Sequence, residues 1–199
     1  RGEPALALEA LVAARQIEGW TRRWQAAATE PVDEMDRLAA WLAARLPSLP
    51  TPPPAVIHND YKFDNVLLDA SDPTCVAGVF DWEMATVGDP WMDAGTALSY
   101  WIDRTDPPEF RALTFSPTDL EGFPTRREIL ARYERTSGRR LPDPVFYYGY
   151  GLFKLAYDIE YDLRQLLYRY LTRLSFSFYD RVQSGQIISR ANSDIRSVQ

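Results

Sequence analysis

The sequence predicts an α+β fold that is mainly α-helical. Residues 4–29 and 31–46 place apolar side chains at helical spacing, and helices are also expected over 90–102, over 125–136 and from Pro144 onward. The runs 55–57, 66–68 and 75–80 are short, apolar and bounded by turn-forming residues, which is typical of strands. With 199 residues the chain can bury a substantial core, and it is most simply one domain or a domain with an appendage.

The first two helices each have a broad apolar face. In the first, the face comprises Leu6, Leu8, Leu11, Val12 and Ile17, with Trp20 and Trp24 one turn apart. Both tryptophans are expected in the core rather than in a ligand cage. Pro31 opens the second helix, whose predicted buried face is Met35, Leu38, Ala39, Leu42 and Leu46. The prolines between 47 and 54 then predict an extended connector.

A β-hairpin is expected in the middle of the chain. A buried strand over Ala55–Ile57 leads into a loop, a second strand covers Val66–Leu68, and residues 75–80 return after a turn over 69–73. Cys75 begins the returning run and is expected to be a small core residue. As the single cysteine, it excludes an intramolecular disulfide and favours a reducing, cytoplasmic compartment.

The helices that follow have clear boundary signals. Pro90 opens a helix to about Ile102, and the proline-rich stretch 103–124 is expected to be a loop, a place where acceptor specificity often lies. Thr125 and Glu128 form a capping-box pattern for a helix that Gly138 closes. The helix after Pro144 carries a packed aromatic face, which comprises Phe146, Tyr147, Tyr150, Phe153, Leu155 and Ala156.

Composition excludes several classes of function. The net charge of -6 argues against a general nucleic-acid binder, and no run of eighteen apolar residues predicts a membrane span. Basic residues are nearly all arginine, with Lys62 and Lys154 the only lysines. An Arg- and Ala-rich chain is typical of a GC-rich bacterial source, and a lysine kept at position 62 mildly supports a specific use for it.

The stretch from His58 to Asn65, with Asp81 sixteen residues later, has the residue types that phosphoryl transfer needs. A carboxylate orients the attacking hydroxyl, an ammonium offsets phosphoryl charge, and an amide oxygen with a second carboxylate holds magnesium. Asp60, Lys62, Asn65 and Asp81 fit those roles in order. A lone histidine or aspartate pair is usually structural, but the two spaced motifs together favour the phosphotransfer interpretation.

The motif His58–Asn65 resembles the H-R-D-x-K-x-x-N loop of protein kinases, and residues 79–83 resemble a variant of their metal-binding D-F-G motif. More closely, H-N-D-Y-K-F-D-N-V-L-L-D and V-F-D-W-E-M-A-T-V-G-D-P-W-M-D-A-G resemble the aminoglycoside phosphotransferase and choline kinase-like superfamily. The nearest branch is the one found in acyl-CoA dehydrogenase-associated phosphotransferases.

The resemblance implies a protein-kinase-like C-terminal lobe with a small catalytic-loop hairpin. It implies transfer from ATP, with Mg²⁺, to a small-molecule hydroxyl. Asp60 would be the base, Lys62 the charge stabiliser, and Asn65 and Asp81 the metal ligands. His58 would organise the loop, and Asp93 would brace it; alternatively, Asp93 is a helix N-terminal carboxylate favoured by the dipole. Asn59 departs from the family's glycine at that position, although Asn tolerates unusual backbone angles better than most residues.

The resemblance to the phosphotransferase superfamily covers residues 1–156 and stops there. Residues 157–199 resemble an intracellular segment of ABC exporter transmembrane domains, which suggests a chimera of two unrelated coding regions. A genuine fusion and a helical extension that packs on the lobe are the alternatives. Residues 1–57 contain neither the Gly-rich phosphate loop nor the strand lysine that the resemblance places in an N-terminal lobe. We therefore expect the nucleotide contacts of that lobe to be missing, and weak or no turnover from this chain alone.

Other functions stay open at this point. The chain could be a non-catalytic binding or scaffold module, or its tail a transporter-derived interaction segment. A metal-dependent hydrolase is less favoured because the chain has one histidine. Aminoglycoside, choline, sugar and hydroxyacyl thioester acceptors all remain possible, and the nearest resemblance mildly favours the last.

Overall fold

The computed structural model describes residues 3–28, 32–112 and 116–173, and for residues 3–12 and most of 160–173 it describes the backbone alone. The chain divides into two compact units, 1–155 and 156–199. In the second unit, the rings of Tyr157 and Tyr161, both on the last helix, stack on each other with centroids 6.2 Å apart. Most of the transporter-like segment 157–199, from residue 174 onward, lies outside the described residues, and its assignment stays a prediction.

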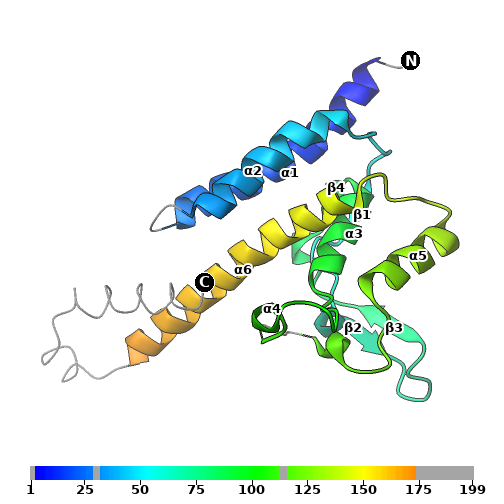
Figure 1. The fold of residues 1–199 in the computed structure, drawn as a ribbon, viewed down its shortest axis with the longest axis vertical. Helices are drawn as coiled ribbons and strands as arrows, with labels where there is room; N and C mark the ends of the chain where they lie inside the picture. The colour runs from blue at the N-terminus through cyan, green and yellow to red at the C-terminus, as the bar shows by residue number, and fades with distance from the viewer. Residues whose placement is uncertain (1–2, 29–31, 113–115, 174–199) are drawn as a thin grey trace, which may run out of the picture. The chain divides into compact units, whose positions relative to one another are not determined.

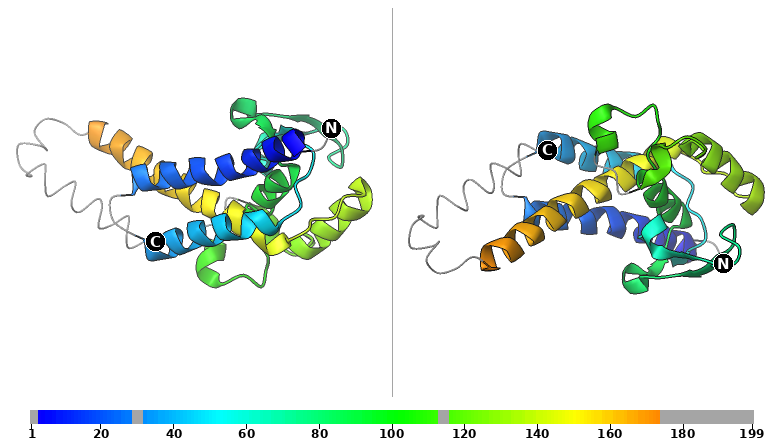
Figure 2. Two further views of the ribbon diagram at one scale, coloured as in Figure 1. Left: turned by 90° about the horizontal axis from the view of Figure 1, so that it is seen from above. Right: turned by 90° about the horizontal axis from the view of Figure 1, so that it is seen from below.

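The first two helices lie side by side (Figures 1 and 2). Helix α1 covers Glu3–Ala27 and buries Trp20 and Trp24, which confirms that both tryptophans belong to the core. Helix α2 covers Asp33–Arg45 and buries Met35, Ala39 and Leu42. It starts two residues after the proline that was expected to open it, and it continues into a 3-10 turn, η1, over Leu46–Ser48. That proline itself, residue 31, lies outside the described residues.

Two small antiparallel sheets flank the motif loop. Strand β2, Val66–Leu68, pairs with β3, Val76–Val79, as the sequence predicts. Strand β1, Ala55–Ile57, pairs with β4, Thr86–Gly88, a strand that the sequence analysis missed. The expectation that β1 is a buried strand was wrong in part, because only one of its residues, Ile57, is buried while Val56 is 71% exposed. The alternation shows a strand with one covered face.

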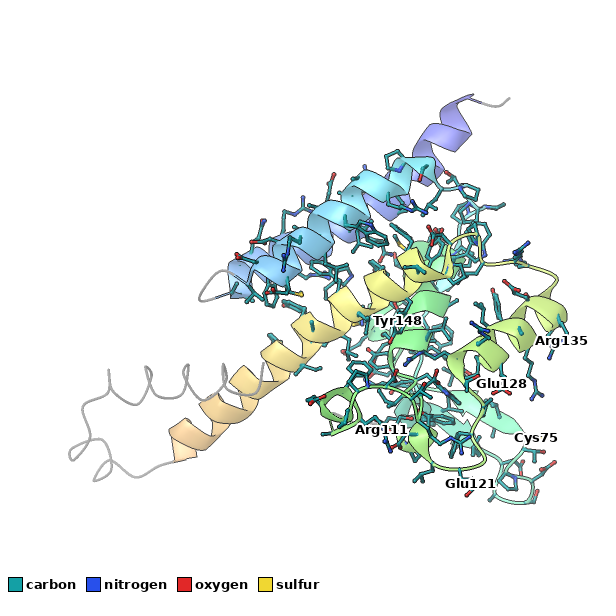
Figure 3. All side chains as sticks on the ribbon, viewed as in Figure 1. Cys75, Arg111, Glu121, Glu128, Arg135 and Tyr148 are labelled. Atoms are coloured by element: carbon teal, nitrogen blue, oxygen red, sulfur yellow. The ribbon has the colours of Figure 1, made fainter. Side chains whose placement is uncertain are left out.

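Cys75 is exposed rather than a core residue. Its backbone N–H donates to the carbonyl of Asp72 and its carbonyl accepts from Asp69, both at 2.9 Å, so it closes the turn that joins β2 to β3. Figure 3 shows Cys75 at the tip of this hairpin. The apolar run that follows it was misleading, because the hairpin projects from the fold and leaves Val76 54% exposed.

Helix α3, Pro90–Ser99, ends earlier than predicted, and Tyr100 follows it. The stretch 103–124 contains a short helix, α4, at Pro108–Ala112 and a 3-10 turn, η4, at Pro117–Asp119, so it is not wholly loop. Two further 3-10 turns, η2 at Phe63–Asn65 and η3 at Trp82–Met84, form the last part of each motif. Helix α5, Arg126–Ser137, has the predicted capping box and ends at Gly138, whose φ of 67° is left-handed.

The last helix, α6, covers Pro144–Arg173. Its predicted aromatic face is confirmed up to the end of the first unit, since Phe146, Tyr147, Tyr150 and Phe153 are all 1% exposed or less. This helix approaches α3 closely where Gly95 of α3 and Gly151 of α6 meet. An added Cβ on Gly95 would lie 2.1 Å from the carbonyl oxygen of Tyr147. The crossing brings the first part of α6 beside the end of α3, near the motif loop. The fold is therefore mainly helical with two small sheets.

Candidate active site

The motif loop runs from β1 to β2 and is fastened to α3 by one carboxylate. Asp93, on the first turn of α3, accepts the backbone N–H of His58 at 2.9 Å and that of Asn59 at 2.7 Å. The side chain of His58 is 3% exposed, its Nε2 lies 2.6 Å from the carbonyl oxygen of Phe80, and its ring packs 4.7 Å from that of Trp82. His58 thus connects the loop to the segment that carries Asp81.

Asn59 has a φ of 66°, in the left-handed region. Glycine reaches this region at no steric cost, and asparagine is among the few other residues that visit it routinely. The position therefore explains why the family pattern has glycine there and why asparagine can replace it. The Asn59 side chain also donates from Nδ2 to the carbonyl oxygen of Met84 at 3.0 Å, which a glycine could not do.

Asp60 is 8% exposed, and both of its carboxylate oxygens are engaged. Oδ1 accepts the hydroxyl of Tyr100 at 2.6 Å. Oδ2 lies 2.9 Å from Nζ of Lys62 and accepts from Nδ2 of Asn65 at 3.0 Å. Burial by itself would raise the pKa of Asp60, but the hydrogen bonds from Tyr100 and Lys62, together with the charges of Lys62 and Lys154, outweigh it and lower that pKa.

Lys154 is a member of the site that sequence reasoning missed. It lies on α6, is 1% exposed, and its Nζ is 3.4 Å from the hydroxyl of Tyr100, which in turn bonds Asp60. Its ammonium also lies 5.2 Å from the centre of the Trp20 ring. One signal was available: it is one of only two lysines, and it stands among the aromatic residues of a buried helix face.

Asn65 and Asp81 lie at the same edge of the β2–β3 hairpin. The backbone carbonyl of Asn65 accepts from Phe80 at 2.8 Å, so the register places Asn65 directly beside the segment that ends in Asp81. Asn65 is buried, and its Nδ2 is turned to Asp60, which leaves its Oδ1 as an available oxygen. Asp81 is exposed and has a φ of 60°.

The donor set at this edge fits a hard cation. Mg²⁺ prefers oxygen ligands and is usually held by one or two carboxylates, with water and substrate phosphates completing its shell. One amide oxygen and one carboxylate match that requirement. Among the described residues no three His, Cys, Asp or Glu side chains cluster as a metal site.

A cavity of about 520 Å³ lies beside the loop. Lys62 and Tyr100 stand at its lining together with Asp64 and Asp93, while most of its wall comes from apolar side chains. These include Phe63, Leu98, Trp101 and Ile129. The cavity can hold a ligand of ordinary metabolite size with an apolar body.

Comparison with known proteins agrees with this geometry. A sequence profile of a family described as "Phosphotransferase enzyme family" matches residues 2–133. Curated relatives include acyl-CoA dehydrogenase family member 11 of Rattus norvegicus, 33% identical over 145 residues, and that of Homo sapiens, 32% identical. A probable acyl-CoA dehydrogenase, IBR3, of Arabidopsis thaliana is 29% identical over 152 residues. Each alignment covers 71% of this chain and 18% of the relative, so the chain spans under a fifth of their length.

A solved structure shows the same fold. The crystal structure of a putative aminoglycoside phosphotransferase from Ralstonia eutropha superimposes with a TM-score of 0.65 and 27% sequence identity. The match covers 94% of this chain and 53% of that one. The kinase-like fold predicted from the motifs is therefore confirmed. Among the described residues, no helix is long and apolar enough to cross a membrane.

Proposed function

The chain belongs to the phosphotransferase enzyme family, and on that premise we propose that it transfers the γ-phosphoryl group of ATP, with Mg²⁺, to a hydroxyl of a small molecule. The observation that carries the proposal is the arrangement around Asp60. A buried carboxylate is held on one oxygen by Tyr100 and on the other by Lys62 and Asn65. Such fixed orientation is what positions an attacking hydroxyl in this chemistry.

In this mechanism Asp60 accepts a hydrogen bond from the acceptor hydroxyl and takes its proton as the new oxygen–phosphorus bond forms. The bond between the γ-phosphorus and the bridging oxygen breaks, and ADP leaves with that oxygen. Lys62, 2.9 Å from Asp60, offsets negative charge on the transferred group. Asn65 and Asp81 would hold Mg²⁺, which when bound neutralises charge on the phosphates.

The lowered pKa of Asp60 supports its role as the hydrogen-bond acceptor that orients the attacking hydroxyl. An ionised carboxylate can accept a hydrogen bond from a hydroxyl, whereas a protonated one would compete as a donor. The hydrogen bond from Tyr100 and the neighbouring lysine charges keep Asp60 ionised although it is buried. The site is thus prepared for a neutral hydroxyl acceptor at physiological pH.

The apolar cavity beside Lys62 supports an acceptor with an apolar body. A polycationic aminoglycoside would find few polar partners along a wall made mainly of Phe63, Leu98, Trp101 and similar side chains. A hydroxyacyl compound, whose chain would contact this wall, fits better, with its hydroxyl beside Lys62 and Tyr100, which line the cavity and contact Asp60. This agrees with the acceptor that the sequence resemblance favours.

Because weak or no turnover is expected from the chain alone, the proposal is tested in a two-lobed form, with a family nucleotide-binding lobe joined ahead of it. The assay is phosphoryl transfer from ATP to a panel of hydroxylated acceptors, with products identified by mass spectrometry. Asp81→Ala removes one of two proposed metal ligands, so we expect a loss of at least about 10²-fold in rate. Glu121→Ala is the matched control, because Glu121 (labelled in Figure 3) is an exposed acidic residue that does not line the cavity beside the loop. A variant Asp81→Ala that keeps most of its turnover contradicts the assignment. Absence of ATP binding even with Mg²⁺ would favour a non-catalytic binding module instead.

A further inference from the structure

The side chain of Asn59 has a feature that phosphoryl transfer does not use. Its Nδ2 donates to the carbonyl oxygen of Met84, but its Oδ1 is buried and has no hydrogen-bond partner, in a residue only 5% exposed. Buried polar atoms without partners are rare in folded proteins, and each calls for an explanation such as a bound ligand. A glycine at this position would supply the backbone conformation without leaving an oxygen unpaired.

Asn59 lines a second cavity of about 520 Å³, on the side of the loop that faces α1. Among the described residues, neither Asp60 nor Lys62 contributes to its lining. The α1 wall carries two cations, Arg15 and Arg23, at the rim of the cavity. Asn59, whose Oδ1 lacks a partner, and two positive charges therefore line one cavity that is open to solvent.

The spacing of the α1 residues builds this wall. Arg15, Gly19 and Arg23 are four residues apart in turn, so they follow one face of the helix. Gly19 lies between the two arginines without a side chain, and an added Cβ there would meet nothing within 4 Å, so the space in front of it is open. A glycine is otherwise a poor choice in a helix interior.

Two contacts hold the wall in place. The guanidinium carbon of Arg23 lies 4.5 Å from the centre of the ring of Trp20, which is buried. Gln16, which also lines the cavity, accepts the hydroxyl of Tyr150 at 2.8 Å through its Oε1. The amide of Gln16 is thereby oriented, and its Nε2 can act as a donor.

We propose that this cavity binds a small anionic molecule that also carries a hydrogen-bond donor. Arg15 and Arg23 hold the anionic group, and Oδ1 of Asn59 accepts the donor of the ligand. Glu83 lines the opposite wall, so its charge keeps the anion on the α1 side. The inference stands on the cavity and its lining and does not depend on phosphoryl transfer.

A comparison of phosphate with sulfate separates the role of the arginines, which hold the anionic group, from the role of Asn59, which accepts a hydrogen bond from the ligand. Near neutral pH both are tetrahedral anions of similar size, but phosphate keeps a P–OH donor and sulfate has none. A site with a buried acceptor strongly disfavours a ligand that cannot donate to it. We therefore expect saturable binding of inorganic phosphate, followed by NMR shifts of residues 15–23 and Asn59 at constant ionic strength, and binding of sulfate weaker by about tenfold.

Four variants complete the test. Asn59→Gly keeps the left-handed backbone and removes the acceptor, so it should abolish the preference for phosphate over sulfate. Arg15→Ala and Arg23→Ala should each weaken both anions. Arg22→Ala is the matched control, since Arg22 is an exposed arginine of the same helix outside the cavity, and it should change neither.

Three results would overturn the proposal. Equal affinity for phosphate and sulfate in the unaltered chain would remove the role of Asn59. Equal weakening by Arg22→Ala and by Arg23→Ala would reduce the effect to diffuse surface charge. Binding that is lost with Lys62→Met but kept with Arg15→Ala would place the phosphate at the catalytic loop, a result that would leave the proposed phosphoryl transfer intact.

Discussion

Replacing Tyr100 by phenylalanine tests the polar chain that holds Asp60. The change removes one hydroxyl, which donates to Oδ1 of Asp60 at 2.6 Å and lies 3.4 Å from Nζ of Lys154. Hydrogen bonds to charged groups contribute roughly 1.5–3 kcal/mol, and this one is short and partly buried. We therefore expect Tyr100→Phe to lower the free energy of unfolding by about 2 kcal/mol at pH 7.

The loss should depend on pH in a definite direction. The folded-state pKa of Asp60 lies below its ordinary value of 3.8, so its ionisation stabilises the fold above that value, and this contribution is lost as the pH falls through the folded pKa. Without the hydroxyl the pKa of Asp60 rises. The difference between the two proteins is then largest at neutral pH and shrinks below about pH 3.8.

Urea unfolding followed by circular dichroism at several pH values measures this effect. Tyr61→Phe is the matched control, because Tyr61 lies in the same loop but is 41% exposed. It should change stability by no more than about 0.5 kcal/mol. The reasoning is refuted if Tyr100→Phe is as stable as this control at pH 7, or if its loss is the same at every pH.

Two further predictions concern stability. Burial raises the pKa of Asp89 from 3.8 to about 6, so the favourable contribution of this carboxyl group to stability is present below pH 3.8 and lost as the pH rises through 6. Asp89→Asn keeps the helix cap. It should raise the free energy of unfolding by up to about 3 kcal/mol at pH 8 and by little at pH 3. Equal effects at the two pH values would contradict this. Gly95→Ala should cost roughly 3 kcal/mol or more, because its Cβ would lie 2.1 Å from the backbone of Tyr147. Gly149→Ala, whose Cβ would meet only two side chains, the nearer at 3.4 Å, is the control and should be neutral or stabilising in the same urea titration.

Features encoded within a few residues could be predicted from the sequence. The capping box of Thr125 and Glu128, the left-handed stop at Gly138 and the β2–β3 hairpin all follow from local chemistry, and all are present. The motif spacing likewise brought His58, Asp60, Lys62 and Asn65 into one loop. Such signals survive because they depend little on the rest of the fold.

The features that were missed depend on distant partners. Strand β4 has three residues and exists because β1, about thirty positions earlier, pairs with it. The residues next to Cys75 in the sequence are apolar, but Cys75 is exposed because the hairpin that carries it projects from the fold. Lys154 reaches Tyr100 only because Gly95 and Gly151 let α6 cross α3 closely. No local pattern records such pairings, so the sequence alone left them open.

The central claim is that Asn65 and Asp81 hold a divalent cation beside Asp60 and Lys62. The most direct measurement uses Mn²⁺ as a paramagnetic substitute for Mg²⁺ in NMR spectra of the chain. The account predicts selective broadening of resonances from residues 60–65 and 80–82, reversed by excess Mg²⁺ and absent in Asp81→Ala. Broadening that is spread over the acidic surface, or that persists unchanged in Asp81→Ala, would contradict it.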